Sequence, residues 1–218
     1  QGCNLIILAC NTASAKALRT IQQRDINPDK LRVLGVIRPT VEVVPQRTHT
    51  KHIGVLATPG TVASESYVIE LLKQDPTLIV TQQACPMWVP LIESGEHLSD
   101  GANYFVEKYL TELLTRDPLI DTIILGCTHY PLLQPKIEAF LSSIAHSQSP
   151  VTNHHRSVVS QGSIVADSFA DYLHRHPEFS QDSKGGTCKY LTTESAAKFS
   201  ESASIFLSEP ITAHHIEL

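Results

Sequence analysis

The sequence predicts an α/β fold built on mainly parallel sheets flanked by helices. Short β-branched and Leu-rich runs alternate with longer segments of helical period, as in successive βα units. A nine-residue segment near the start recurs in the second half, which indicates two similar halves. With 218 residues, of which 42% are hydrophobic, the chain is long enough to bury a substantial core in one large domain or two small ones.

The expected elements follow in order from the hydrophobic pattern. Strands are the short apolar runs, and helices are the segments in which apolar residues recur every three to four positions. We expect strands near 4–9, 33–37, 53–57, 78–81, 122–126 and 163–166. We expect helices near 12–24, 61–73, 98–115, 130–144, 166–175 and 194–206.

Composition argues against several classes of protein. The formal net charge of -5, without any stretch dense in Lys and Arg, argues against a nucleic-acid partner. The longest apolar runs are far shorter than the roughly 18 to 20 residues that span a bilayer, so we expect no membrane segment. No secretory signal is recognisable either. We therefore expect a cytoplasmic protein.

Cysteine usage fits that location. The five cysteines are an odd number at irregular spacing, which matches neither a disulfide framework nor a CxxC metal or redox site. Reduced thiols in a cytosolic protein are the better interpretation. They are Cys3, Cys10, Cys85, Cys127 and Cys188.

The internal repeat centres on two of these thiols. The segment 4–12 aligns without a gap on 121–129, with four identical positions. In each copy an apolar strand leads into a small residue, a cysteine and two polar residues, and a helical pattern follows. Cys10 and Cys127 are thus predicted at the carboxyl ends of strands, where ligands bind in open α/β sheets.

A structural interpretation of these cysteines is the alternative, because free Cys is among the most buried residue types. We would prefer it for a single cysteine. For a matched pair followed by Asn-Thr and Thr-His we favour function. Cys85, in a proline-opened segment with the only Trp, is expected to be inert and packed.

Other polar positions have weaker interpretations. Thr61 lies in an Ala-Thr-Pro-Gly-Thr turn with two possible roles. The turn either holds a carboxylate or simply caps a helix through Thr58 or Thr61. The pairs His154-His155 and His214-His215 lack the spacing and neighbouring ligands of a metal site, so we expect no metal.

Two opposed thiols permit one reaction in particular. A thiol has a reference pKa of about 8.5 that its surroundings can bring toward neutrality, so it can act as base or acid. Inverting a stereocentre with one exchangeable hydrogen needs two such groups, which exchange roles in the reverse direction. The repeated motif supplies two similar groups, Cys10 and Cys127, and His129 is placed to exchange a proton with the second.

Substrate fixation requires donors for a carboxylate and acceptors for an ammonium group. Short polar side chains on the strand-to-helix turns supply them. They are Asn11, Thr12, Thr61 and Thr128. We find neither a Gly-rich dinucleotide fingerprint nor a P-loop. No lysine stands out as a pyridoxal ligand, since Lys16 is expected to be solvated, and we expect no cofactor.

At these residues the sequence resembles a known family. The strings ILACNTASA and ILGCTHYPLL resemble the two signature motifs of glutamate racemases, within the aspartate/glutamate racemase superfamily. The likeness extends to GVLATPGTVASESY, ACPMWVPLIESG and SIVADSFADYL, and so covers nearly the whole chain in the expected order.

The resemblance implies a pyridoxal-independent, metal-free racemase that makes D-glutamate for peptidoglycan. It implies Cys10 and Cys127 as acid/base thiols, with His129 assisting the second. Substrate contacts would come from Asn11, Thr12, Thr61, Thr128 and His129, and more weakly from Glu93. Two pseudo-symmetric domains would enclose the active site in the cleft between them: residues 1–38 plus 158–218, and residues 39–157. A homodimer is also expected, since family members are often dimers.

Two departures from the family pattern carry expectations of their own. Relatives commonly have Glu-Pro-Gly where this chain has Arg38-Pro39-Thr40, a segment we expect to form a hinge loop together with the polar stretch near 146–160. Relatives also carry Asp-Ser-Gly and Pro-Tyr-Gly elements ahead of the first cysteine motif. We expect that the start of the protein is missing and that these 218 residues alone are inactive.

Two alternatives stay open at this stage. One is an aspartate racemase or related amino-acid racemase of the same superfamily, because the placement of the thiols is shared. The other is a non-catalytic homologue that binds a metabolite or a partner protein, as reported for family members that affect DNA gyrase. The matched cysteines and His129 count against the second.

Overall fold

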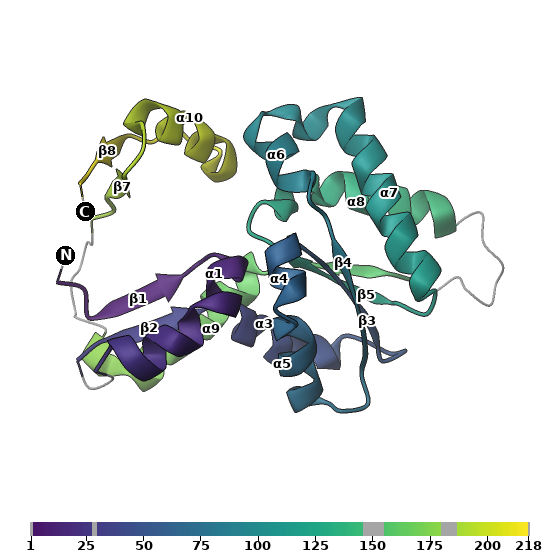
Figure 1. Ribbon diagram of the computed structural model, residues 1–218, viewed down its shortest axis with the longest axis horizontal. Helices are drawn as coiled ribbons and strands as arrows, with labels where there is room; N and C mark the ends of the chain where they lie inside the picture. Colours follow the sequence, from purple (N-terminus) through teal and green to yellow (C-terminus); the bar gives the residue numbers. More distant parts are fainter. Residues whose placement is uncertain (1, 28–29, 146–154, 180–186, 218) are drawn as a thin grey trace. The chain divides into compact units, whose positions relative to one another are not determined.

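The computed structural model describes residues 2–27, 30–145, 155–179 and 187–217 (Figure 1). Its contacts group into two compact units, Gln1–Phe179 and Ser180–Leu218, which are described separately. This grouping differs from the division into 1–38 plus 158–218 and 39–157 that the family resemblance implies, and that division stays a prediction.

The first unit holds two parallel sheets (Figure 1). One is two-stranded, with Leu5 opposite Arg32 and Leu8 opposite Gly35. The other has four strands in the order β4-β3-β5-β6, all parallel. The strands are β1 (Leu5–Leu8), β2 (Arg32–Gly35), β3 (His52–Ala57), β4 (Ile79–Ala84), β5 (Thr122–Gly126) and β6 (Ser157–Val159).

Helices cover both faces of the four-stranded sheet, and its central strands are correspondingly apolar after their first residues, His52 and Thr122. Side chains of β5 alternate between the faces: Ile123 and Leu125 join one core cluster and Ile124 joins the other. The first cluster includes residues of α6 (Trp88–Glu93), α7 (Asp100–Arg116) and α8 (Gln134–Ala145). The second includes residues of α3 (Ile37–Val43), α5 (Ser66–Gln74) and α9 (Gly162–Arg175), and Figure 1 shows these groups on opposite sides.

Shorter helical segments connect these elements, and local chemistry sets their limits. Ser99 caps α7, because its Oγ accepts the backbone N–H of Ala102 at 3.3 Å. Glu65 adopts a left-handed backbone with φ 54° and so divides the single helix expected over 61–73 into two. The segments are α1 (Asn11–Lys16), α2 (Leu18–Thr20), η1 (Ile21–Asp25), η2 (Val44–Gln46), α4 (Pro59–Ala63), η3 (Glu96–Leu98), η4 (Tyr130–Leu133) and η5 (Pro177–Phe179).

The second unit is one small βαβ element. β7 (Tyr190–Thr192) runs into α10 (Ala196–Leu207), which returns to β8 (Ala213–His215). The two strands are parallel, with Leu191 opposite His214. Ser195 caps the helix by accepting the N–H of Lys198 at 3.4 Å. This helix was expected near 194–206, whereas the two flanking strands were not.

Two expectations from the sequence are wrong. Residues 163–166 are not a strand but belong to α9, and the strand lies earlier, at β6. A short apolar run such as this one does not distinguish a strand from a buried helical turn. Arg38-Pro39-Thr40 is not a loop but lies in the first turn of α3, where proline is tolerated because its missing N–H needs no partner. Most of the polar stretch near 146–160 lies outside the described residues.

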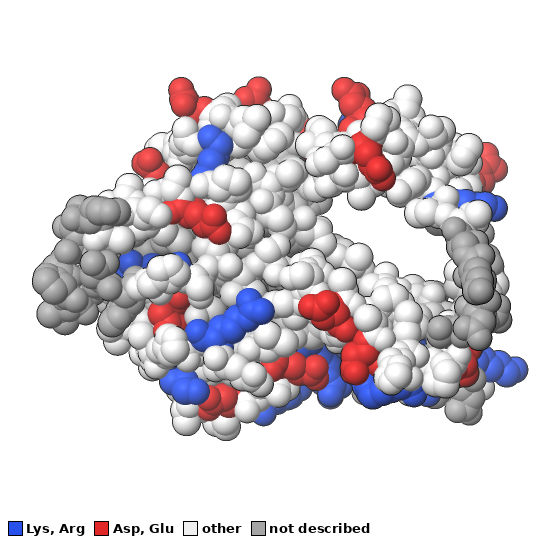
Figure 2. All heavy atoms as spheres, turned by 180° about the vertical axis from the view of Figure 1, so that it is seen from behind, with Lys and Arg blue, Asp and Glu red and all other residues white. Residues whose placement is uncertain are grey.

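Among the described residues, no helix is long and apolar enough to cross a membrane. On the face shown in Figure 2, Lys and Arg side chains are interspersed with Asp and Glu. The formal net charge of -5 is therefore not gathered into one field of a single sign on that face.

Candidate active site

The first cysteine lies in a turn that backbone and side-chain bonds fasten. Cys10 follows β1 by two residues and is the N-cap residue of α1. Its carbonyl accepts the N–H of Ser14 at 2.9 Å, and the Ser14 hydroxyl donates to the carbonyl of Leu8 at 2.8 Å. The backbone of the turn is thus held on both sides of Cys10, whose residue is exposed.

Three threonine hydroxyls join this turn to the one that follows β3. Thr12 lies 2.9 Å from Thr58 and 3.1 Å from Thr61, measured between their Oγ1 atoms, and Thr58 and Thr61 are 3.1 Å apart. Thr58 also caps α4, as one of the two sequence interpretations had it. A Cβ on Gly60 would lie 3.1 Å from the Thr12 methyl group, so a glycine permits this close approach.

The second cysteine directly follows β5. Gly126, the residue before it, has little room for a side chain: a Cβ there would lie 3.1 Å from the Tyr67 ring and 3.2 Å from the Leu56 carbonyl. The Cys127 residue is only 8% exposed. Burial is the main reason that the pKa of its thiol is raised, and negative charge on Cys10 raises it further.

Donors around the Cys127 sulfur act in the opposite direction. The backbone N–H groups of His129 and Tyr130 and the side chain of Thr128 favour the thiolate and so lower its pKa. They offset part of the burial effect. The surroundings therefore keep the thiol protonated near neutral pH, and the donors stabilise the negative charge that forms when the proton leaves.

Both cysteine turns meet at the carboxyl ends of the strands of the four-stranded sheet. Ala57, the last residue of β3, pairs in register with Gly126, the last residue of β5. Thr58, which contacts Thr12 of the first turn, follows Ala57 directly. Negative charge on Cys10 raises the pKa of Cys127, which agrees with this arrangement because like charges repel at short range.

His129 links the second thiol to a carboxylate. Its Nδ1 lies 3.9 Å from the Cys127 sulfur, and its Nε2 lies 2.5 Å from Oε1 of Glu93, the last residue of α6. The carboxylate bond leaves Nδ1 of the neutral ring as the acceptor that faces the thiol. Glu93, the weakest sequence candidate, thus contacts His129.

Asn11 is placed differently from the other candidates. Its residue is 2% exposed, and both ends of its amide are bonded within the protein, to Gln161 at 2.7 Å and Tyr67 at 2.7 Å. Sequence reasoning singled out neither partner for a role. Tyr67 belongs to a string that resembles the family, whereas Gln161 lies 150 residues from Asn11 and offers no local signal.

Cys85 also lies at these strand ends, because it directly follows β4 and its N–H donates to the Ala57 carbonyl at 2.9 Å. It is buried, and burial raises its pKa well above 9.0, in keeping with an inert thiol. Among the described residues, no group of three or more His, Cys, Asp or Glu is arranged to hold a metal, and His154 lies outside them.

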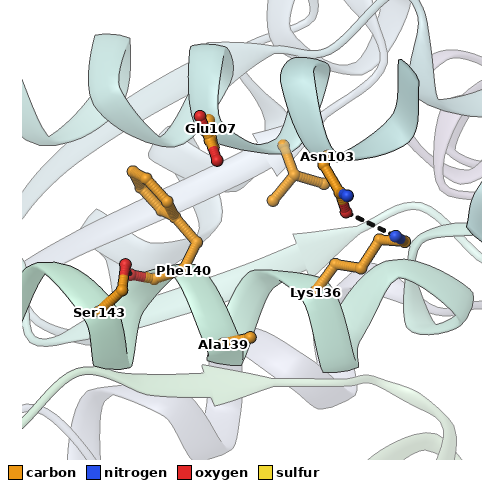
Figure 3. Close-up of a pocket in the computed structure, with 7 residues that line it drawn as sticks. Asn103, Glu107, Lys136, Ala139, Phe140 and Ser143 are labelled. Atoms are coloured by element: carbon orange, nitrogen blue, oxygen red, sulfur yellow. Dashed lines mark hydrogen bonds between the residues drawn. The ribbon is translucent and has the colours of Figure 1, made fainter. Parts of the chain in front are cut away.

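A cavity of about 270 Å³ between α7 and α8 is lined without either thiol (Figure 3). In it Lys136 donates to Asn103 Oδ1 at 2.5 Å and to the carbonyl of Leu98 at 3.1 Å. These contacts fasten α8 to the start of α7, which is a structural role.

A family model described as Asp/Glu/Hydantoin racemase matches residues 1–152 of the chain. The chain belongs to this family. The Asp/Glu/Hydantoin racemase assignment confirms the family expected from the cysteine motifs, and the parallel sheets flanked by helices confirm the expected fold class.

Relatives within this racemase family support the assignment in sequence and in structure. Glutamate racemases of Ruegeria sp. (strain TM1040) and Lactiplantibacillus plantarum are 39% and 36% identical over 97% and 98% of this chain, and 76% and 73% of their own. The crystal structure of a glutamate racemase isoform from Bacillus anthracis matches with a TM-score of 0.83 at 29% identity, over 99% of this chain and 74% of that one. The glutamate racemase of Aquifex pyrophilus gives 0.70, also at 29% identity, over 98% and 74%.

Proposed function

We propose that this chain is a glutamate racemase, an isomerase that interconverts L- and D-glutamate by proton transfer between Cys10 and Cys127. The observation that carries the proposal is the placement of the Cys10 turn against the turn that follows β3, next to the Cys127 turn that follows β5, in a chain of the racemase family. The curated relatives compared above are named glutamate racemases, so an aspartate racemase or a non-catalytic homologue is not favoured.

The reaction proceeds in two proton transfers. One cysteine, as the thiolate, removes the proton from the α-carbon. An S–H bond forms, the C–H bond breaks, and the electron pair of the C–H bond stays on a planar carbanion. The other cysteine, as the thiol, then gives its proton to the opposite face, which forms the new C–H bond and leaves a thiolate. Each direction of the reaction needs one thiol and one thiolate, and negative charge on Cys10 raises the pKa of Cys127, so that Cys127 keeps its proton while Cys10 is ionised.

His129 assists the second thiol in this proposal. Its ring accepts the Cys127 proton before Cys127 acts as a base, and Glu93 stabilises the cation that results. Substrate contacts come from the hydroxyls of Thr12, Thr61 and Thr128, with Asn11 beside the first thiol. Thr61 is fully buried and held by two other hydroxyls, so its position is fixed before substrate arrives.

The remaining features follow the resemblance to the family. The D-glutamate product would supply peptidoglycan synthesis, and the enzyme would need neither metal nor pyridoxal. We also propose a cytoplasmic location, a homodimer, and the division into residues 1–38 plus 158–218 and 39–157 around the active site. Cell fractionation and sedimentation of the 24.0 kDa chain test the first two of these.

The decisive experiment follows α-deuterium exchange and racemisation of each glutamate enantiomer in heavy water. It compares the wild-type protein with variants in which one of the two thiols is replaced. We expect the wild type to racemise glutamate in both directions. Cys10→Ser and Cys127→Ser should each lower racemisation by about a thousandfold or more.

A single variant that keeps one thiol should still exchange the α-hydrogen of one enantiomer, because each thiol serves one face. Cys188→Ser is the matched control, since that cysteine is exposed in the separate C-terminal unit and should leave racemisation unchanged. Wild-type exchange from both enantiomers in both single variants would refute the proposal.

A further inference from the structure

Three buried side chains beside the first thiol form a closed ring of hydrogen bonds. Asn11 Nδ2 donates to Gln161 Oε1 at 2.7 Å, Gln161 Nε2 donates to the Tyr67 hydroxyl at 2.6 Å, and that hydroxyl donates to Asn11 Oδ1 at 2.7 Å. The three residues are 2%, 8% and 0% exposed. Because such groups are costly to bury without partners, the ring is a satisfied network rather than chance proximity.

The surroundings of the ring settle the direction of every bond. Gln161 Nε2 also lies 3.4 Å from the Val36 carbonyl, which only accepts, so the atom there must be a donor nitrogen. The Thr40 hydroxyl donates to that carbonyl at 3.3 Å and accepts from Gln161 at 2.9 Å. The other end of the Gln161 amide is then its oxygen, so the Asn11 atom that faces it is the donor nitrogen. The Asn11 oxygen therefore faces Tyr67, whose hydroxyl donates its proton to it.

The ring joins the two cysteine turns. Asn11 directly follows Cys10, and the Tyr67 ring packs against Gly126, directly before Cys127. Gln161 adds a third attachment, because it is the N-cap residue of α9. The orientation of the Cys10 turn is therefore set by residues from α5 and α9, elements remote from it in sequence.

We propose that Gln161 and Tyr67 are positioning residues for Cys10: by fixing both ends of the Asn11 amide they hold the turn that carries the first thiol. This inference rests on the proposed racemase function and deepens it. Both residues act through Asn11, to which each is bonded. Their loss affects the proton transfer made by Cys10 and leaves the transfer made by Cys127 nearly intact.

The test uses Tyr67→Phe, which keeps the packing on Gly126 but removes the hydroxyl, and Gln161→Met, which keeps the side-chain length but removes the amide. Gln134→Met is the matched control, because Gln134 makes its bond to Glu138 on the surface. Circular dichroism and urea unfolding first show that each variant is folded. We expect both ring variants to lower kcat/KM by about tenfold, and the control to leave it unchanged.

Primary isotope effects separate positioning from a general structural loss. With α-deuterated substrates, the isotope effect on kcat/KM should rise for the enantiomer whose deuteron Cys10 removes and fall for the other. The single-cysteine variants identify which enantiomer that is. A substitution that only perturbs the fold would lower kcat/KM for both enantiomers without moving the two isotope effects apart. That result would overturn the inference.

A second readout does not need activity. The rate at which iodoacetamide alkylates Cys10, followed by peptide mass spectrometry, should change by roughly threefold in both ring variants, because the released turn no longer holds the exposed sulfur in one orientation. The exposed Cys188 serves as internal reference. Unchanged Cys10 alkylation would also refute the positioning role. If the wild type does not racemise glutamate, the proposed function fails, whereas alkylation still tests the ring.

Discussion

At the scale of single residues, the two thiols differ although their motifs match. Cys127 is buried against donors and faces His129, whereas Cys10 is exposed and lies next to a side chain held by a hydrogen-bond ring. In the proposed mechanism, two similar acid/base groups are therefore supported by different means. A histidine and a carboxylate contact one of them, and a rigid turn holds the other.

The role of Glu93 can be tested at this scale. Glu93→Gln removes the charge that stabilises protonated His129, so we expect kcat to fall by about tenfold or more with KM nearly unchanged. Steady-state racemisation kinetics measure both constants, and Glu96→Gln, on the same stretch of chain, is the control. A rise in KM at constant kcat would instead support Glu93 as a direct substrate contact.

At the scale of elements, the starts of the central strands are fastened by a buried carboxylate. Asp121, just before β5, accepts the Thr48 hydroxyl at 2.6 Å and the backbone N–H groups of His49 and Thr50 at 2.7 and 2.9 Å. Burial alone would raise its pKa, but these bonds outweigh burial and leave the pKa lowered from its usual 3.8. The loop before β3 is thereby tied to β5.

We predict that Asp121→Asn lowers the free energy of unfolding by about 2 kcal/mol at pH 7, because it removes the charge from several hydrogen bonds. A lowered pKa contributes stability above the unfolded value and loses it as the pH falls through the folded value. The difference between variant and wild type should therefore shrink below about pH 4. Urea unfolding at several pH values measures it.

Asp171→Asn is the control for that series, since Asp171 pairs with Arg175 on an exposed helix face and its loss should cost less than about 1 kcal/mol. A difference for Asp121→Asn that stays constant down to pH 2 would contradict the electrostatic explanation.

At the scale of the whole molecule, buried ionisable groups in the core of the first unit make the free energy of unfolding decrease at high pH. Burial raises the pKa of Cys85, Tyr67 and Tyr130 above their usual values of 9.0 for the thiol and 10.0 for the phenols. Groups with a raised folded pKa contribute stability that is complete below the unfolded value and is lost as the pH rises through the folded one. The loss thus begins near pH 9.

We expect the free energy of unfolding to be flat from pH 7 to about 8 and to fall above pH 9, by up to about 1.4 kcal/mol per pH unit for each such group. Cys85→Ala should be less stable at pH 7 because it leaves a cavity, but its decline should be shallower. Urea unfolding under reducing conditions gives both curves. Parallel curves for variant and wild type would show that Cys85 plays no part in the decline.

The sequence alone determined the fold class, five of the strands and the two cysteine turns. Each of these is written in a local pattern: a short apolar run for the strand, and a cysteine followed by polar residues for the turn. The predicted strand at 163–166 and the loop at Arg38-Pro39-Thr40 were wrong because short segments have weak local preferences that tertiary packing overrides.

Only the tertiary structure decided which side chains meet. The bond between Glu93 and His129 crosses 36 residues of sequence, and the bond between Asn11 and Gln161 crosses 150. No periodicity or spacing reports such contacts, because they depend on how strands and helices stack once the core is buried. The local pattern thus placed the two thiols, whereas packing determined which side chains surround them.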